Sequence, residues 1–125
     1  MVERRIVLGD SYRDLIVWQR AIQLTLDVYK LTAAFPESEK FGLINQLRRA
    51  SVSVASNIAE GYGKSTKGEY RLFLGHARGS NFEVATQLVI ASGLGFAAPA
   101  ALQNTEALCD EVGKMLVAIM KKLQV

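Results

Sequence analysis

Hydrophobic side chains recur at spacings of three and four residues along four stretches of the chain, a periodicity that predicts amphipathic α-helices. The first stretch, residues 12–34, carries two parallel hydrophobic lines. One line consists of Leu15, Trp18, Ile22, Leu26, Tyr29 and Ala33. The other consists of Val17, Ala21, Leu24, Val28, Leu31 and Phe35. A helix that is hydrophobic over more than one stripe is buried on two sides, so we expect it at the centre of the fold or in an oligomer interface.

The second helix is expected from Ser38 to about Tyr62. Its start is marked by the serine hydroxyl, which can cap a helix, and its end by Gly61 and Gly63. Pro36 separates it from the first helix, because proline disfavours helical geometry in the preceding residue. Its core face consists of Leu43, Leu47, Ala50, Val54 and Ile58.

The third helix is expected over residues 67–92, with Ser65 or Thr66 as its cap and a break at 93–99. Its core side consists of Tyr70, Leu74, Ala77, Val84, Leu88 and Ala91. The fourth helix has a regular seam that consists of Leu102, Thr105, Cys109, Val112, Leu116, Ile119 and Leu123. Alternating spacings of three and four are typical of helices that pack lengthwise in a bundle.

Four such helices with short connections predict an all-α fold, an up-down-up-down antiparallel four-helix bundle. The chain has 125 residues, half of them hydrophobic and only two of them proline, which is typical of one folded domain. We therefore predict a single domain over residues 1–125, with residues 1–11 as a flexible N-terminal extension.

Sequence features exclude several locations and chemistries. No apolar run reaches the roughly 18 residues that a membrane helix needs, and no secretory signal pattern opens the chain, so we predict a cytoplasmic protein without a membrane partner. Cys109 is the only cysteine, which excludes an internal disulfide. The chain also has no Cys/His cluster for zinc, and we expect Cys109 to be a buried, unreactive thiol.

Positive charge is concentrated in the middle of the chain. The net charge is +3, but residues 40–80 hold seven Lys or Arg side chains against two acidic ones, so that segment is +5 and the remainder is −2. Such asymmetry can attract phosphate backbones or an acidic protein, and it is equally typical of ordinary solvated helix faces. The candidate nucleic-acid contacts are Arg48, Lys64, Lys67, Arg71 and Arg78.

Aromatic side chains offer candidate stacking platforms for bases. Tyr62 and Tyr70 are the better candidates, because they flank the turn that carries Lys64 and Lys67. The aromatic residues of the first helix alternate with Leu and Ile on the same helix, and we assign them to the core. They are Trp18, Tyr29 and Phe35.

A polar line follows the core face of the second helix and continues on the third. It consists of Gln46, Arg49, Ser53, Asn57, Glu60, Ser80 and Glu83. These side chains can face each other in a small cleft between the two helices. We interpret the line mainly as a structural network in which Glu60 and Glu83 pair with Arg49 or Arg78, since a buried carboxylate is tolerated only when it is paired.

Catalysis is not expected from this set. His76 is the only histidine, no nucleophile has an evident activating base, and no glycine-rich phosphate loop follows a strand. A di-iron site in a four-helix bundle needs paired Glu-x-x-His motifs, which one histidine cannot supply. We predict no catalytic residues, no metal site and no cofactor.

Three segments carry a family resemblance: YRDLIVWQRA, VYKLTAAFPESEKFGLINQLRRASVSVASNIAEGYG and FLGHARGSNFE. Together they resemble the bacterial four-helix-bundle proteins encoded in intervening sequences of 23S ribosomal RNA genes. The resemblance spans residues 12–96. Ala55 stands where that family commonly has proline, and residues 81–84 are an atypical version of their segment.

The resemblance implies an up-down-up-down bundle, assembly as a homopentameric ring and no established enzymatic activity. A related branch, the accessory variability determinant proteins of diversity-generating retroelements, is similar in fold and works with a reverse transcriptase and nucleic acid through a basic surface. That similarity is at the level of the fold.

We therefore predict a non-enzymatic, oligomeric accessory or scaffold protein that associates with RNA or DNA. The alternative is a protein-protein interaction module that binds an acidic partner without nucleic acid. Both functions use the basic segment, and the repeated sites of an oligomer would strengthen either one.

Overall fold

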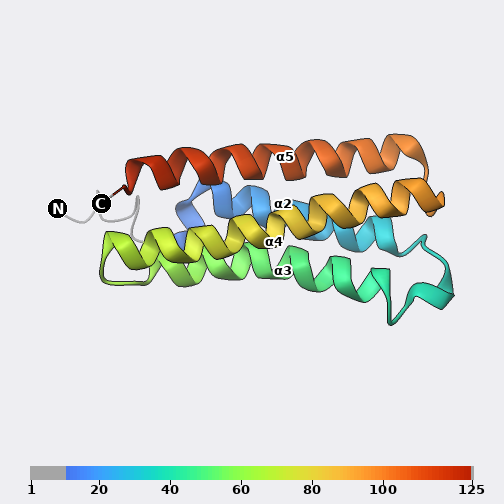
Figure 1. The fold of residues 1–125 in the computed structure, drawn as a ribbon, viewed down its shortest axis with the longest axis horizontal. Coiled ribbons are helices and arrows are strands. Elements are labelled where there is room, and N and C mark those ends of the chain that lie inside the picture. The colour runs from blue at the N-terminus through green and yellow to red at the C-terminus, as the bar shows by residue number, and fades with distance from the viewer. Residues whose placement is uncertain (1–10, 125) are drawn as a thin grey trace.

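Four long helices, packed side by side, make up the fold of the computed structural model, which describes residues 11–124. They are α2 (Ile16–Thr32), α3 (Leu43–Tyr62), α4 (Lys67–Leu94) and α5 (Pro99–Lys122), and short 3₁₀ helices η1 (Tyr12–Asp14) and η2 (Glu37–Glu39) precede α2 and α3. Successive long helices run in opposite directions (Figure 1). The predicted four-helix bundle is confirmed, and residues 11–124 contain no strand.

The first predicted helix is divided in two. Leu15 has an extended backbone, with φ −75° and ψ 124°, between η1 and α2. The Ser11 hydroxyl accepts a hydrogen bond from the backbone N–H of Arg13, and the Tyr12 ring meets Trp18 edge-on at 5.2 Å, so η1 is fixed against α2. Residues 1–10 of the predicted N-terminal extension lie outside the described residues, and Ser11 belongs to the folded part.

The second helix begins later than predicted, at Leu43. Ser38 lies inside η2, and the cap comes from Glu39, whose Oε1 accepts a hydrogen bond from the backbone N–H of Leu43 at 3.0 Å. A carboxylate at this place also complements the positive end of the helix dipole. The prediction that Ser38 caps this helix is therefore wrong.

Local signals fix both ends of α4. Thr66 accepts a hydrogen bond from the backbone N–H of Glu69 at 3.1 Å, the capping arrangement expected of a Thr-x-x-Glu sequence. Gly95 ends the helix with φ 70°, a left-handed conformation that favours glycine. The helix runs two residues beyond its predicted end, and α5 starts earlier than predicted, with Pro99 in its first turn.

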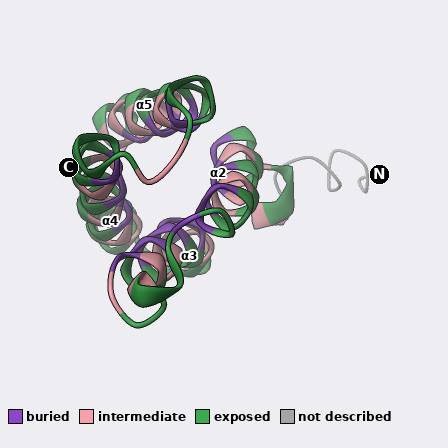
Figure 2. Ribbon diagram, turned by 90° about the vertical axis from the view of Figure 1, so that its right-hand side faces the viewer, coloured by how far each residue is buried: buried purple, intermediate pink, exposed green. Residues whose placement is uncertain are grey.

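The core fills the space between the four helices in two clusters, one toward each half of the bundle. Figure 2 shows buried residues on the faces that the helices turn toward one another. Of the two hydrophobic lines on α2, the line from Val17 to Phe35 is buried. The other line reaches the surface, where the side chain of Leu26 is 52% exposed and that of Tyr29 is 43% exposed. The assignment of Tyr29 to the core is therefore wrong, whereas Phe35 is buried and Trp18 half-buried.

Polar contacts connect α5 to the helices on either side. Arg20 on α2 makes a two-pronged ion pair with Glu111, with distances of 2.7 and 3.2 Å. On the other side, the buried amide of Asn81 donates to the carbonyl oxygen of Cys109 at 2.9 Å, and the Cys109 thiol lies 3.3 Å from Asn81 Oδ1. Burial raises the pKa of the Cys109 thiol to about 12. The predicted buried cysteine is confirmed.

Helices α3 and α4 approach each other closely at Gly61. A Cβ atom added there would lie 2.8 Å from the Cβ atom of Phe73, closer than folded proteins allow. Gly61 is buried inside α3, so this glycine serves helix packing, and the helix ends one residue later, at Tyr62. None of the helices in residues 11–124 is long and apolar enough to span a bilayer.

Candidate functional site

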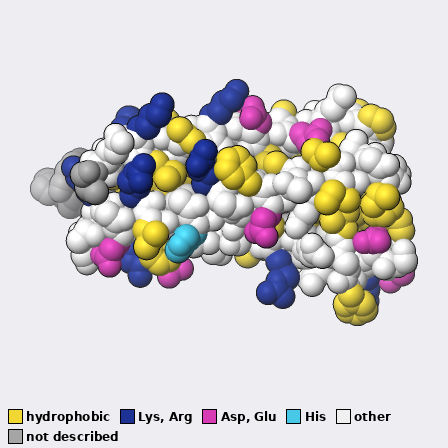
Figure 3. All heavy atoms as spheres, viewed as in Figure 1, with side chains coloured by type: hydrophobic (Ala, Val, Ile, Leu, Met, Phe, Trp, Pro, Cys, Tyr) yellow, Lys and Arg dark blue, Asp and Glu magenta, His cyan; other side chains and the backbone are white. Residues whose placement is uncertain are grey.

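One end of the bundle carries all of the net positive charge of residues 11–124. This basic end comprises η1, the turn between α3 and α4, and the last turn of α5 (Figure 1). Its Lys and Arg residues are Arg13, Lys64, Lys67, Arg71, Lys121 and Lys122. The same end carries three carboxylates, those of Asp14, Glu60 and Glu69. In Figure 3, Lys and Arg side chains gather toward this end on the face that α4 and α5 present to the viewer.

Three of the predicted nucleic-acid contacts lie at the basic end. Lys67 is exposed and makes no hydrogen bond or ion pair with residues 11–124. Lys64 places its ammonium group 4.8 Å from the centre of the Phe73 ring. Arg71 donates from Nε to the carbonyl oxygen of Met120 at 3.1 Å, which fixes the start of α4 to the end of α5.

The other two predicted contacts lie elsewhere and have internal partners. Arg48 donates from Nε to the Thr32 hydroxyl at 2.8 Å and from Nη2 to the carbonyl oxygen of Tyr29 at 3.3 Å. These bonds tie Arg48 on α3 to the last turn of α2, where the Tyr29 carbonyl oxygen also accepts from the backbone N–H of Ala33 at 3.2 Å. Arg78 lies over the Phe82 ring, 4.9 Å from its centre, between α4 and α5. The five residues therefore do not form one surface.

Lys121 and Lys122 are members of the basic end that the sequence analysis did not select. Both are exposed in the last turn of α5. The antiparallel topology contains the signal that would have identified them, because it places the end of the fourth helix beside the turn between the second and third. The charges of residues 40–80 are neighbours in sequence only, so a count over that segment does not include Lys121 and Lys122, which are neighbours in space.

The predicted stacking residues pack against each other at the same end. The rings of Tyr62 and Tyr70 meet edge-on with centres 6.1 Å apart, and both side chains are half-buried. Burial raises the pKa of Tyr70, and the neighbouring Tyr62 raises it further. Each ring therefore keeps only part of its surface for a ligand.

The uncharged part of the polar line connects α3 to α4. Ser53 and Ser80 share a hydrogen bond of 2.8 Å between their hydroxyl oxygens. Asn57 donates to the Ser53 hydroxyl at 3.0 Å and to its carbonyl oxygen at 2.9 Å. Further along, Gln87 donates to Oε1 of Gln46 at 3.4 Å. The Ser53–Ser80 and Gln46–Gln87 bonds cross between the helices without any charged group.

The charged part of the line does not pair. The side chains of Arg49, Glu60 and Glu83 are exposed, and none of them makes an ion pair within residues 11–124. The predicted pairing of the two carboxylates with Arg49 or Arg78 is absent because water solvates these groups at the rim and no buried charge requires a partner.

A cleft of about 520 Å³ runs between α3 and α4 at the end opposite the basic end. Four of its eight lining residues belong to the polar line. The complete lining is Phe41, Asn45, Gln46, Arg49, Ala50, Ser53, Glu83 and Gln87. We refer to it as the α3/α4 cleft. It holds the unpaired Arg49 on one wall and the unpaired Glu83 on the other, above the buried Ala50.

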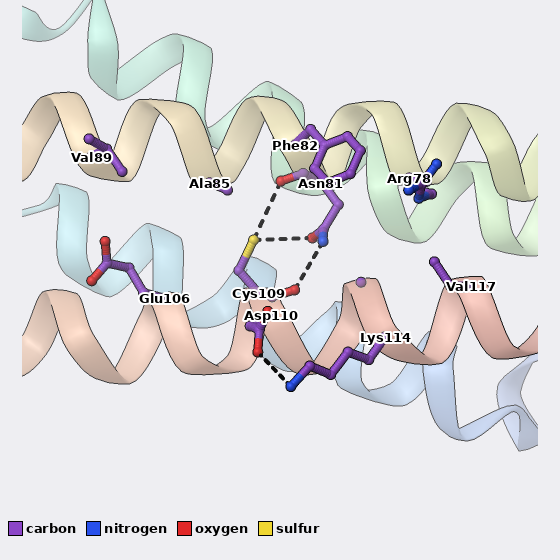
Figure 4. Close-up of a pocket in the computed structure, with 11 residues that line it drawn as sticks. Arg78, Asn81, Phe82, Ala85, Val89, Glu106, Cys109, Asp110, Lys114 and Val117 are labelled. Atoms are coloured by element: carbon purple, nitrogen blue, oxygen red, sulfur yellow. Dashed lines mark hydrogen bonds and ion pairs between the residues drawn. The ribbon is translucent and has the colours of Figure 1, made fainter.

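A groove of similar size, about 510 Å³, lies between α4 and α5 (Figure 4). Its walls are mostly apolar, with Phe82 54% exposed and Val89 64% exposed. The Asn81–Cys109 hydrogen bonds cross its floor, and the ion pair between Asp110 and Lys114 lies on its rim. We refer to it as the α4/α5 groove.

Metal-binding chemistry has no counterpart among the described residues. Within residues 11–124, no three His, Cys, Asp or Glu side chains converge as metal ligands do. His76 is exposed and packs edge-on against Phe73, with ring centres 5.3 Å apart. It makes no hydrogen bond with any carboxylate in the described part of the chain.

Residues 13–118 match the sequence model of a family described as 23S rRNA-intervening sequence protein. The chain belongs to this family. The solved structure of a protein of unknown function from the S23 ribosomal protein family of Bacteroides thetaiotaomicron is similar, with a TM-score of 0.77 and 18% identity. The similarity covers 85% of this chain and 99% of that one. No curated protein matches the chain.

Membership of the 23S rRNA-intervening sequence protein family confirms the resemblance seen in the three sequence segments. The solved relative, at 18% identity, shows that the bundle is a fold of such proteins and carries no information on individual site residues. The family match ends at residue 118, so Lys121 and Lys122 of the basic end lie beyond it.

Proposed function

We propose that this member of the 23S rRNA-intervening sequence protein family is a cytoplasmic, non-enzymatic scaffold that assembles into a ring and binds RNA through its basic end. The observation that carries the proposal is the separation of two kinds of surface. Exposed apolar side chains that include Leu26, Val52 and Val89 lie along the sides of the bundle, whereas the net positive charge lies at one end. Assembly through the sides leaves that end free to contact phosphates.

Two different apolar surfaces support assembly. One is the α4/α5 groove. The other lies on the outer side of α2 and α3, where Leu26, Tyr29 and Val52 are exposed beside a shallower groove of about 280 Å³. The end view places these surfaces on opposite sides of the bundle (Figure 2). Contact between unlike surfaces closes into a ring where the rotation from one subunit to the next divides a full turn, and we propose the pentamer that the family resemblance implies.

The basic end supports nucleic-acid binding by charge alone. Lys67, Lys121 and Lys122 are exposed and have no partner within residues 11–124, so their ammonium groups are free to replace the counterions of a phosphate backbone. A ring repeats this weak site in every subunit. The family description refers to intervening sequences of 23S rRNA, and we take RNA as the first nucleic acid to test.

The test is RNA binding across a salt series for the wild type and the double variant Lys67→Ala, Lys121→Ala. We expect the double variant to bind more weakly, and the slope of log affinity against log salt to flatten by about one unit per lost contact in each engaged subunit. Unrelated RNA sequences should be affected alike, because phosphate contacts do not read bases. Lys30→Ala, an exposed lysine at the opposite end, is the control.

A protein partner is the second candidate function, and the α4/α5 groove is the observation that favours it. Its apolar walls and charged rim suit an amphipathic helix of another protein. In that function the basic end would attract an acidic segment of the partner. Lack of RNA affinity at low salt, in a protein that is folded and oligomeric, would favour this candidate over RNA binding.

A further inference from the structure

We propose that the α3/α4 cleft is a nucleotide site, in which Phe41 stacks on a base, carboxamides and Glu83 bind its amino edge, and Arg49 binds its phosphate. The proposal deepens the proposed function and rests on it where the nucleotide is part of an RNA strand. It adds a contact to the base, which the basic end does not make. The cleft lies at the other end of the bundle, so the two sites can be tested separately.

Phe41 is the first observation. Its side chain is 87% exposed, the most exposed large hydrophobic residue in residues 11–124, at the mouth of the cleft just before α3. The chain could bury a phenylalanine in this region, since Phe35 is only 6% exposed. A flat ring held in water next to polar groups is the arrangement by which proteins stack on unpaired bases. Lys40, whose ammonium lies 5.7 Å from the ring centre, adds positive charge beside it.

The carboxamides on the walls are the second observation. Asn45 and Gln46 on α3 face Gln87 on α4, and each amide presents a donor beside an acceptor. Gln87 Oε1 is buried and has no hydrogen-bond partner within residues 11–124. A buried acceptor without a donor is unfavourable. The terminal torsion of glutamine is soft, so a ligand amino group in the cleft can turn this oxygen toward itself and satisfy it.

The unpaired charges are the third observation. Arg49 lies on the α3 wall and Glu83 on the α4 wall, and within residues 11–124 they pair neither with each other nor with another group. A ligand that satisfies both must bear an anion at one side and an amino donor at the other. A nucleotide with an exocyclic amino group has this pattern, and about 520 Å³ is within the usual range of ligand sites.

The same groups predict which bases bind. Adenine and cytosine present an amino donor beside a ring-nitrogen acceptor, which matches the acceptor and donor of a carboxamide. Uracil presents a carbonyl oxygen at the place of that amino group, where it would face the Glu83 carboxylate. We expect adenosine and cytidine monophosphates to bind more tightly than uridine monophosphate.

The first experiment titrates the full-length protein with AMP, CMP and UMP and follows the side-chain amide NMR signals of Asn45, Gln46 and Gln87. We expect saturable shifts at millimolar nucleotide that are largest for AMP or CMP. Phe41→Ala should weaken AMP binding about tenfold, the usual scale of one stacked base. Ile16→Ala removes an exposed hydrophobic side chain outside the cleft and should leave AMP binding unchanged.

The second experiment separates phosphate from base. Arg49→Gln should remove the preference for AMP over adenosine and keep residual adenosine binding, whereas Arg78→Gln, a control outside the cleft, should preserve the preference. Glu83→Gln should reduce discrimination against UMP. Circular dichroism and oligomeric mass measured on the same samples show whether each variant is folded and assembled.

Two results would overturn the proposal. One is unchanged amide signals in the cleft at millimolar AMP, CMP and UMP. The other is equal weakening by Phe41→Ala and Ile16→Ala. If RNA still binds with a steep salt slope in either case, the proposed function survives and the nucleotide site fails. If AMP binds in the cleft but the double variant Lys67→Ala, Lys121→Ala leaves RNA affinity unchanged, the proposal for the basic end fails and the proposal for the cleft stands.

The source of the base is tested by titration with oligo(A) and oligo(U) in place of the mononucleotides. Tighter binding of oligo(A) than of AMP would show that the cleft binds a base of a strand, and equal binding would show that it binds a free nucleotide.

Discussion

Arg48 and Arg71 each donate to an oxygen near the end of a helix other than their own. Arg48 reaches the last turn of α2, and Arg71 reaches the last turn of α5. A cation at the end of a helix complements the negative end of the helix dipole. These two arginines therefore contribute first to the packing of the bundle, and the exposed lysines are better candidates for ligand contact.

Replacement of Arg48 tests this division of roles. Arg48→Ala should lower the free energy of unfolding by about 1–2 kcal/mol, because it removes two charge-assisted hydrogen bonds and the contact with the Tyr29 ring. Arg49→Ala, next to it and exposed, should change stability by less than about 0.5 kcal/mol. Urea unfolding of both variants measures the difference, and equal effects would mean that Arg48 does not support α2.

The buried thiol of Cys109 predicts a dependence of stability on alkaline pH. Its pKa is raised to about 12 in the folded protein, so the protonated thiol stabilises the fold fully below the unfolded pKa near 9, and this contribution is lost between about pH 9 and 12. Between pH 8 and 10 the wild type should lose about 1 kcal/mol more than Cys109→Ala. Thermal melts at both pH values measure this, and parallel losses would contradict it.

Helix formation was predictable from the sequence because burial repeats with the local period of the helix. Helix ends were less predictable. The cap on α3 depends on the Glu39 carboxylate reaching forward to Leu43, while Ser38, the better cap by residue type, lies in a 3₁₀ turn. The spacing of the polar line predicted the cleft between α3 and α4. It did not predict that Arg49 lacks an ion pair within residues 11–124, because pairing depends on solvent exposure and residue spacing does not determine exposure.

Two glycines illustrate opposite roles within the helices. Gly61 lies where α3 meets α4, and an added methyl group would collide with Phe73. Gly79 lies in the interior of α4, exposed, with no atom within 4 Å of a Cβ position, so packing within residues 11–124 does not require a glycine there.

This contrast gives a prediction for helix α4. Gly79→Ala should stabilise the protein by about 0.5–1 kcal/mol, since alanine favours the helix and meets open space. Gly61→Ala should destabilise it, because the helices must move apart. Differential scanning calorimetry of the pair checks both signs, and a lower melting temperature for Gly79→Ala would show that a neighbouring subunit covers that position.

The whole bundle has apolar surfaces that a monomer leaves in contact with water. The α4/α5 groove and the outer side of α2 and α3 are unlike in shape, and they lie on opposite sides of the molecule (Figure 2). A surface of this kind usually marks an interaction site. The Lys and Arg residues of the basic end belong to neither apolar surface.

Multi-angle light scattering tests assembly directly. We expect a mass several times the 13.7 kDa of one chain, with five copies as the predicted number. Leu26→Glu and Phe82→Glu should each dissociate the oligomer, because each places a charge on one of the two apolar surfaces. Ser65→Glu, in the exposed turn between α3 and α4, is the control. A mass of 13.7 kDa for the wild type at micromolar concentration would contradict a ring.

Helix α3 runs from the α3/α4 cleft to the basic end, so its length sets the distance between the two sites. Twenty helical residues extend about 30 Å, while stacked nucleotides along one strand are about 3.4 Å apart. A strand that occupies both places on one subunit must therefore be about nine nucleotides long. Shorter oligonucleotides can occupy only one of them, so the affinity gained per added nucleotide should rise sharply near that length and then level off.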